Sequence, residues 1–72
     1  MSRFTLVGVD GNAFSVMGYT QRCLKQAGLE DKIHEMRIKA MDGDYSNCIC
    51  VCLEYVEMAN KALEMEDEED EF

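Results

Sequence analysis

The sequence predicts a mainly α-helical domain of three helices, with one short N-terminal β-strand that pairs between subunits. Apolar residues recur at three- and four-residue steps in three segments, and no proline interrupts them. Only one run, near the N-terminus, has the composition of a strand. With 72 residues the chain forms at most one domain, and a domain of this size buries only about 60% of the surface that its unfolded chain exposes. A second copy of the chain is one way to supplement so small a core.

The strand is expected over residues 4–9, which read Phe-Thr-Leu-Val-Gly-Val and are followed by the turn dipeptide Asp10-Gly11. A lone strand leaves its backbone N–H and C=O groups without partners. No second segment of this chain has the composition of a strand that could form hydrogen bonds with it. The economical partner is the same strand of another copy, so we expect a homo-oligomer.

The first helix is expected from Asn12 to Ala27. Asp10 or Asn12 can cap its N-terminus, because a short side-chain oxygen accepts from the free backbone N–H groups there. Gly28 follows its last residue, as a glycine commonly does at a helix end. Its apolar stripe comprises Ala13, Val16, Met17, Thr20, Cys23, Leu24 and Ala27.

A second helical pattern follows Glu30 and Asp31, whose negative charges complement the positive end of a helix dipole. Gly43 stops it. The stripe of this second helix comprises Ile33, Met36, Ala40 and Met41.

The third helix is the longest and is capped by Asp44. Its stripe comprises Cys48, Ile49, Cys52, Leu53, Val56, Ala59 and Leu63. The sequence thus predicts a folded domain over residues 1–63 and an acidic, disordered tail over residues 64–72. Carboxylates near the C-terminus of a helix oppose its dipole and repel one another, so we expect the tail to fray.

The formal charge of −8 resides mostly in that tail, which holds seven of the fifteen acidic residues and no basic one. The first 63 residues carry eight acids against seven bases and are nearly neutral. The tail is interpreted as a solubilising end, as an attractant for a basic protein surface, or as a mimic of nucleic-acid phosphates. Direct binding of DNA or RNA is disfavoured, because holding phosphates requires a net basic face.

No apolar run approaches the roughly 20 residues that crossing a bilayer requires, and the N-terminus lacks the pattern of a secretory signal. We therefore expect a cytoplasmic protein without a membrane partner. Reduced thiols fit that location.

The four cysteines are Cys23, Cys48, Cys50 and Cys52, and sulfur clusters of this kind can bind zinc or copper. On a helix, however, Cys50 points away from Cys48 and Cys52, which fall on the apolar stripe. Core packing is the preferred interpretation, and no metal or cofactor is expected. The single histidine, His34, lies in a surface-like stretch without a nearby serine nucleophile, so we expect no enzymatic activity.

A small ligand site is predicted at the start of the first helix. Residues 8–12 follow the expected strand and open a helix, where free N–H groups can hold an anion, although a turn with a helix cap also explains them. Dimerisation can bring basic and polar side chains of two copies to this point. The candidate ligand-binding residues are Asp10, Gly11, Asn12, Arg22, Arg37 and Tyr45.

Two motifs resemble those of a group of small hypothetical proteins from bacteriophages and bacteria. The first is Gly-Val-Asp-Gly-Asn-Ala-Phe at residues 8–14, followed by Gly18 and Ala27-Gly28; the second is Gly-Asp-Tyr at residues 43–45. The resemblance covers residues 7–58 and excludes the acidic tail. Asp42 departs from a usual small residue, and Cys48 and Cys52 from usual aliphatic ones, which supports a packing role for these thiols. The resemblance implies a phage-like origin and a host-cell cytoplasmic location, but no mechanism.

Three functions are consistent with these observations. The first is a non-enzymatic phage accessory protein that counters host defence by sequestering a small nucleotide signal in a pocket between subunits. The second is an inhibitor whose tail occupies a basic, nucleic-acid-binding surface of a host defence protein. The third is a structural or regulatory helical module without a ligand.

Overall fold

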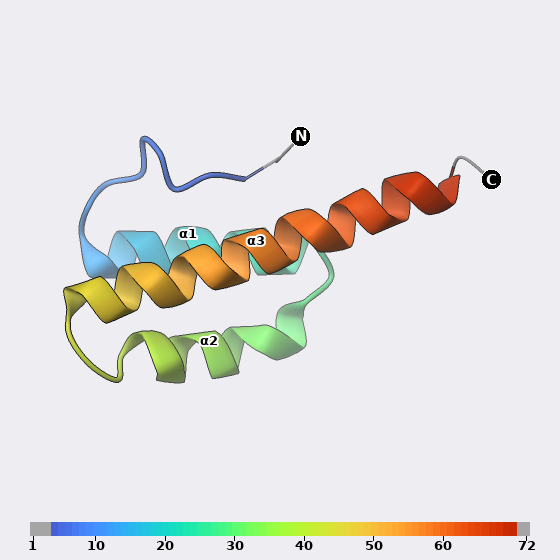
Figure 1. Cartoon of the computed structure of the whole chain (residues 1–72). Coiled ribbons are helices and arrows are strands. Elements are labelled where there is room, and N and C mark those ends of the chain that lie inside the picture. Colours follow the sequence, from blue (N-terminus) through green and yellow to red (C-terminus); the bar gives the residue numbers. More distant parts are fainter. Residues whose placement is uncertain (1–3, 71–72) are drawn as a thin grey trace.

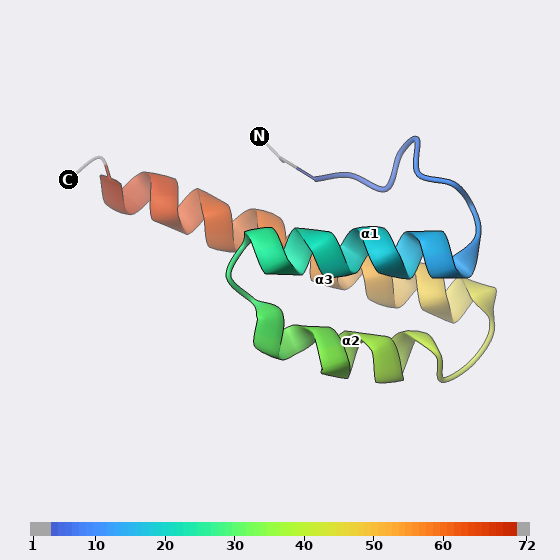
Figure 2. The ribbon, with the colours of Figure 1, turned by 180° about the vertical axis from the view of Figure 1, so that it is seen from behind.

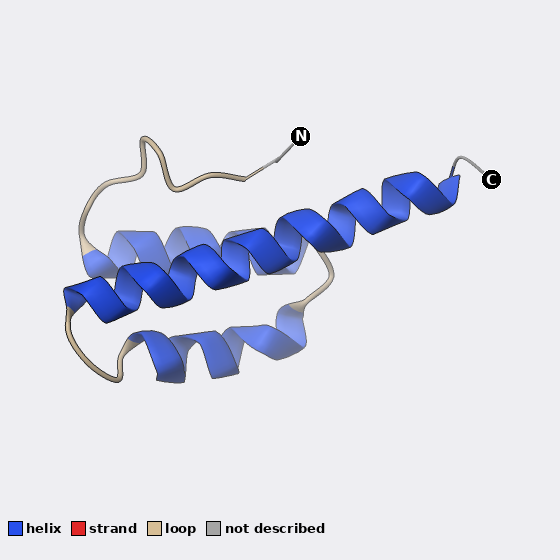
Figure 3. Ribbon diagram, in the orientation of Figure 1, coloured by secondary structure: helices blue, strands red, loops and turns tan. Residues whose placement is uncertain are grey.

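The computed structural model describes residues 4–70 of the chain, and side chains as far as residue 64. The described part contains three α-helices, α1 (Ala13–Gln26), α2 (Ile33–Ala40) and α3 (Tyr45–Asp70), with a short 3₁₀ turn, η1 (Glu30–Lys32), before α2 (Figure 3). The prediction of a mainly helical domain with three helices is confirmed.

The helices are arranged so that α1 and α3 run side by side in the same direction, while α2 runs back along them (Figures 1 and 2). Helix α3 packs against both other helices, and α1 and α2 contact each other less. The start of α1, the end of α2 and the start of α3 therefore lie together at one end of the bundle, which we call the bundle end.

Helix α1 forms as its sequence predicts. The extended backbone of Asn12 places its side chain to accept a hydrogen bond of 2.8 Å from the N–H of Phe14. At the other end, Gly28 adopts a positive φ of 76°, which glycine tolerates without strain. Six of the seven residues in the predicted stripe are buried and the seventh, Ala13, is partly buried, so the helical periodicity identified the packed face.

Helix α2 has only eight residues, and its buried residues are Met36 and Ala40. Met41, which the sequence places on the same stripe, is instead 60% exposed. It is the C-cap, so it lies where the helix has already ended. Gly43 follows with a φ of 137°, which turns the chain toward α3.

Helix α3 begins after Asp44, whose carboxylate accepts a hydrogen bond of 3.0 Å from the N–H of Asn47, as predicted for a cap. Leu53, which belongs to the predicted stripe, is 49% exposed. Val51, Tyr55 and Asn60, which lie outside that stripe, are buried. Since α3 packs against α1 and α2 together, its buried arc is wider than one stripe and extends to Tyr55.

The helical backbone of α3 continues past Leu63 to Asp70, beyond the boundary at which the sequence predicts the tail to begin. No glycine or proline interrupts this stretch, so nothing in the local chemistry of the backbone ends the helix there. The division into a domain and a disordered tail stays a prediction, and residues 71–72 lie outside the described part. Across residues 4–70, no helix combines the length and apolar character that a membrane crossing requires.

The predicted strand over residues 4–9 is not found. This segment forms bends and a turn, with Gly8 at a φ of 88° and the N–H of Val9 bonded to the C=O of Leu6 at 3.1 Å. The side chain of Asn60 on α3 both accepts from the N–H of Phe4 and donates to its C=O, at 2.9 and 3.0 Å. The segment thus finds backbone partners within its own chain, which removes the reason for expecting a strand paired between subunits.

Candidate functional site

A hollow of about 260 Å³ lies at the bundle end. All three helices and the loop before α3 contribute to it, and its lining is mostly apolar. The lining residues are Ala13, Phe14, Met17, Ala40, Met41, Gly43, Asp44, Tyr45 and Cys48. We call this feature the bundle-end hollow.

Large apolar side chains stand exposed around this hollow. Phe14 from α1 is 71% exposed, Met41 at the end of α2 is 60% exposed, and Tyr45 at the start of α3 is 49% exposed. They come from three elements and meet at one place because the helix ends meet there. Single exposed apolar side chains are common, but a group around a concavity indicates a contact surface.

Hydrogen bonds hold the walls of the hollow in place. The hydroxyl of Tyr45 donates to the backbone carbonyl of Gly11, which ties the start of α3 to the loop before α1. The side-chain amide of Asn47 donates to the carbonyls of Lys39 and Asp42, each at 2.9 Å, and so occupies acceptors left free at the end of α2. The hollow is thereby built on fixed elements.

Of the six predicted ligand-binding residues, the fold gathers three at the bundle end. Gly11 and Tyr45 are bonded to each other, and Asn12 caps α1 directly beside them. Asp10 precedes them in the chain and is exposed.

The two predicted arginines lie elsewhere in the chain. Arg22 is ten residues beyond Asn12, which is about 15 Å along a helix. It lines a second hollow of about 200 Å³ with Phe4, Tyr19, Cys23 and Gln26. Arg37 donates a hydrogen bond of 3.1 Å to Gln21 across the α1–α2 contact. Within one copy, neither arginine lines the bundle-end hollow.

One backbone N–H group in the first turn of each of the two helices that start at the bundle end has a side-chain acceptor within the chain. Asn12 accepts from Phe14, and Asp44 accepts from Asn47. These contacts favour the interpretation of residues 8–12 as a turn with a helix cap over that of an anion-binding loop.

Three of the four thiols, Cys23, Cys48 and Cys52, are buried in the core, whereas Cys50 is exposed. Burial raises the pKa of Cys23 and of Cys52, so both remain protonated thiols at neutral pH. Their arrangement agrees with the expected packing role and with the outward direction of Cys50. Among the residues described, no three histidine, cysteine or acidic side chains lie close enough together to hold a metal ion.

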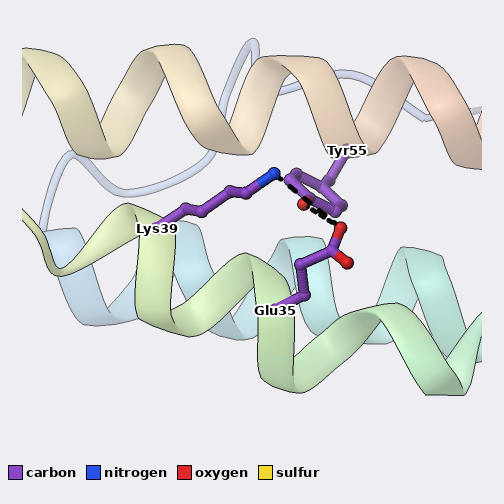
Figure 4. A network of polar contacts seen from close by, with 3 residues as sticks. All are labelled: Glu35, Lys39 and Tyr55. Atoms are coloured by element: carbon purple, nitrogen blue, oxygen red, sulfur yellow. Dashed lines mark hydrogen bonds and ion pairs between the residues drawn. The ribbon is translucent and has the colours of Figure 1, made fainter.

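A polar network joins α2 to α3 away from the hollow (Figure 4). The buried Tyr55 of α3 donates its hydroxyl hydrogen to Glu35 of α2, and Lys39 lies 3.9 Å from the same carboxylate and 5.7 Å from the centre of the Tyr55 ring. The hydrogen bond from Tyr55 lowers the pKa of Glu35, with help from the charges of Lys32 and Lys39. Burial, and then the hydrogen bond to Glu35, raises the pKa of Tyr55.

Each member of this network is engaged with the other two. Contact with the Tyr55 hydroxyl and the charge of Glu35 raise the pKa of Lys39, so it remains charged. His34, one residue before Glu35, is exposed. The network therefore links α2 to α3 and supports their packing.

Comparison of the chain with protein-family models, with curated proteins and with solved structures finds no match. The resemblance to small phage and bacterial proteins stays a prediction.

Phe14 is not among the predicted site residues, and Met41 is predicted to lie in the core, whereas both line the hollow. A signal for Phe14 was present, because a large aromatic residue one position off the stripe of α1 has no place in the core. For Met41 no local signal existed, since its exposure depends on where α2 ends.

Proposed function

We propose that this protein is a non-enzymatic binding module that docks an apolar side chain of a partner protein in the bundle-end hollow. The observation that carries the proposal is the group of exposed apolar side chains, Phe14, Met41 and Tyr45, around one preformed concavity. Binding energy at protein interfaces is concentrated where a few large side chains fill pockets of this kind.

The size and charge of the hollow support a side-chain anchor over a small-molecule ligand. Its volume of about 260 Å³ falls below the roughly 300–1,000 Å³ typical of small-molecule sites. Its only charged lining residue is Asp44, which repels phosphate groups. An apolar anchor is compatible with both properties.

The proposal that the bundle-end hollow binds a partner and does not catalyse a reaction is supported by the titratable groups. The described groups with shifted pKa values are Tyr19, Cys23, Glu35, Lys39, Cys52 and Tyr55. None of these six lines the bundle-end hollow. Catalytic sites instead tend to concentrate shifted groups in their cleft.

Selection of binding peptides from a random library on the immobilised protein tests this proposal. We expect the selected peptides to share one large apolar residue, and their binding to be lost in Phe14→Gln and Met41→Gln. Ile38→Gln and Leu53→Gln are matched controls, because both side chains are similarly exposed but lie outside the hollow. Selected peptides that bind all four variants equally would contradict docking in the hollow.

A second candidate is the sequestration of a small nucleotide by a phage accessory protein, in a pocket between subunits that includes the hollow beside Arg22. This hollow of about 200 Å³ is too small to hold a nucleotide by itself, so a second copy would have to complete the pocket. The guanidinium of Arg22 can bind a phosphate, and Phe4 and Tyr19 line the same hollow with aromatic rings. Native mass spectrometry with cyclic and linear nucleotides tests it. A retained nucleotide that is lost in Arg22→Gln would support this candidate, and a bare protein mass would reject it for that panel.

The acidic segment over residues 64–72 supports a third candidate, an inhibitor of a basic protein surface. Residue 64 is 19 residues beyond Tyr45 on α3, or about 28 Å along the helix, so the segment and the hollow can be tested separately. Deletion of residues 64–72 abolishes binding if charge carries the function and preserves it if the hollow does. Self-association and a cytoplasmic location in a host cell remain part of the proposal, and sedimentation analysis tests the first.

A further inference from the structure

One acidic side chain lines the bundle-end hollow, and two more aspartates adjoin residues of the bundle end in the sequence. Asp44 lines it, Asp42 lies between the lining residues Met41 and Gly43, and Asp10 directly precedes Gly11, whose carbonyl is bound by Tyr45. All three aspartates are exposed. No lysine, arginine or histidine is among the lining residues.

The nearest basic residues along α2 are engaged elsewhere. Arg37 is bonded to Gln21 of α1 at 3.1 Å, and Lys39 is paired with Glu35 and lies over the ring of Tyr55. The negative charge around the hollow is therefore not neutralised by these cations of the same helix.

We infer that the occupant of the bundle-end hollow is a basic amphipathic segment of a partner protein, with one large apolar anchor flanked by lysine or arginine side chains. The inference rests on the proposed docking function and specifies its partner. Apolar contact with Phe14, Met41 and Tyr45 supplies affinity, while Asp10, Asp42 and Asp44 select the flanking charge.

Charge also argues against a second copy of this chain as the occupant. In a symmetric dimer through this surface, the same patch of each copy faces the other, so acidic borders meet acidic borders. The whole chain carries a net charge of −8, which adds long-range repulsion. A basic partner is repelled neither by the acidic border nor by the net charge of the chain.

Two synthetic helical peptides test the inference. Both carry the same leucine and phenylalanine positions, and their remaining positions are lysine in one and glutamate in the other. Titration followed by ¹H–¹⁵N NMR and calorimetry is expected to show binding of the lysine peptide alone. The shifted signals should include Phe14, Met41 and Tyr45, and affinity should fall as salt is raised.

The triple variant Asp10→Asn, Asp42→Asn, Asp44→Asn removes the charge and keeps the fold, because asparagine caps a helix as well as aspartate does. We expect this variant to bind the lysine peptide with about tenfold lower affinity, since each exposed ion pair contributes only modestly. Phe14→Gln should lower the affinity for the lysine peptide whether or not these charges are present.

Each alternative outcome overturns a different statement. Equal binding of both peptides at the hollow overturns the basic partner and leaves docking intact. Binding of the lysine peptide that maps to residues 64–72 and is lost on their deletion places the site on the acidic segment instead. A dimer that dissociates in Phe14→Gln makes a second copy the occupant. Failure of both peptides overturns the inference, and the library selection then decides whether docking itself survives.

Discussion

The interior of the bundle and the bundle end differ in how their side chains are paired and covered. In the interior, polar groups find partners: the hydroxyl of Thr20 donates to the carbonyl of Val16 at 2.9 Å, and Tyr55 donates to Glu35. No buried side-chain nitrogen or oxygen of the described residues lacks a hydrogen bond. At the bundle end, Phe14 and Met41 remain exposed beside a hollow. If the bundle end binds a partner as proposed, stability and binding reside in separate regions, and each can be changed without the other.

Truncation of a core side chain should have the largest effect on stability. Leu24 is fully buried between the helices, and Leu24→Ala is expected to lower the free energy of unfolding by about 2–5 kcal/mol. That is a large fraction of the about 5–15 kcal/mol that stabilises a typical domain. Leu53→Ala is the matched control, because Leu53 is 49% exposed. Urea unfolding followed by circular dichroism measures both; similar losses would refute the assignment of α3's packed face.

Release of the N-terminal segment should have the second-largest effect on stability. Asn60 is 8% exposed and holds both backbone groups of Phe4, so Asn60→Ala is expected to cost about 1–3 kcal/mol. The amide of Phe4 should then lose protection in hydrogen exchange, while the amides of α1 keep theirs. Unchanged protection at Phe4 would show that other contacts hold the segment.

Removal of the Tyr55 hydroxyl should have a smaller and pH-dependent effect. The pKa of Glu35 is lowered in the folded protein, so its contribution is present above the unfolded pKa and is lost as pH falls through the folded pKa. Stability should therefore decline below about pH 4. Tyr55→Phe removes the main cause of the shift and should flatten this acid limb.

The decline of stability at alkaline pH provides a second test of the same network. The raised pKa values of Tyr55 and Lys39 give a contribution that is present below their unfolded pKa values and is lost as pH rises through the folded ones. Thermal unfolding of wild type and Tyr55→Phe across pH 2–11 checks both limbs. Parallel pH profiles of the two proteins would contradict the network's role.

The smallest effect on stability is expected at the bundle end. Phe14→Gln should change the free energy of unfolding by less than about 0.5 kcal/mol, because its side chain is 71% exposed and glutamine is a good helix former. Its effect should instead appear in peptide binding. Strong destabilisation by Phe14→Gln would break the separation between the interior and the bundle end.

Local patterns in the sequence were sufficient for most of the fold. The stripe of α1, its Asn12 cap and the Asp44 cap of α3 depend on residues within one or two turns, so they can be identified without knowledge of the rest. The burial of Tyr55 could not be identified this way, because it depends on α2 packing against α3 as well as α1.

The candidate site was only partly visible in the sequence. Within one chain Gly11, Asn12 and Tyr45 lie close together, whereas the two arginines lie elsewhere. The convergence of these residues across subunits stays a prediction. The apolar character of the hollow was missed, because it arises where three helix ends meet.

By itself, the sequence determined three helices, the side-chain caps of α1 and α3, and the face of α1 that packs, since these follow from periodicity and from hydrogen bonds between near neighbours. Tertiary structure decided where residues 4–9 lie, because Asn60, 56 residues from Phe4 along the chain, bonds both backbone groups of Phe4. It also decided that Met41 is exposed and that Phe14, Met41 and Tyr45 surround one hollow. Contacts between residues so far apart in sequence depend on how the helices pack, which no local pattern encodes.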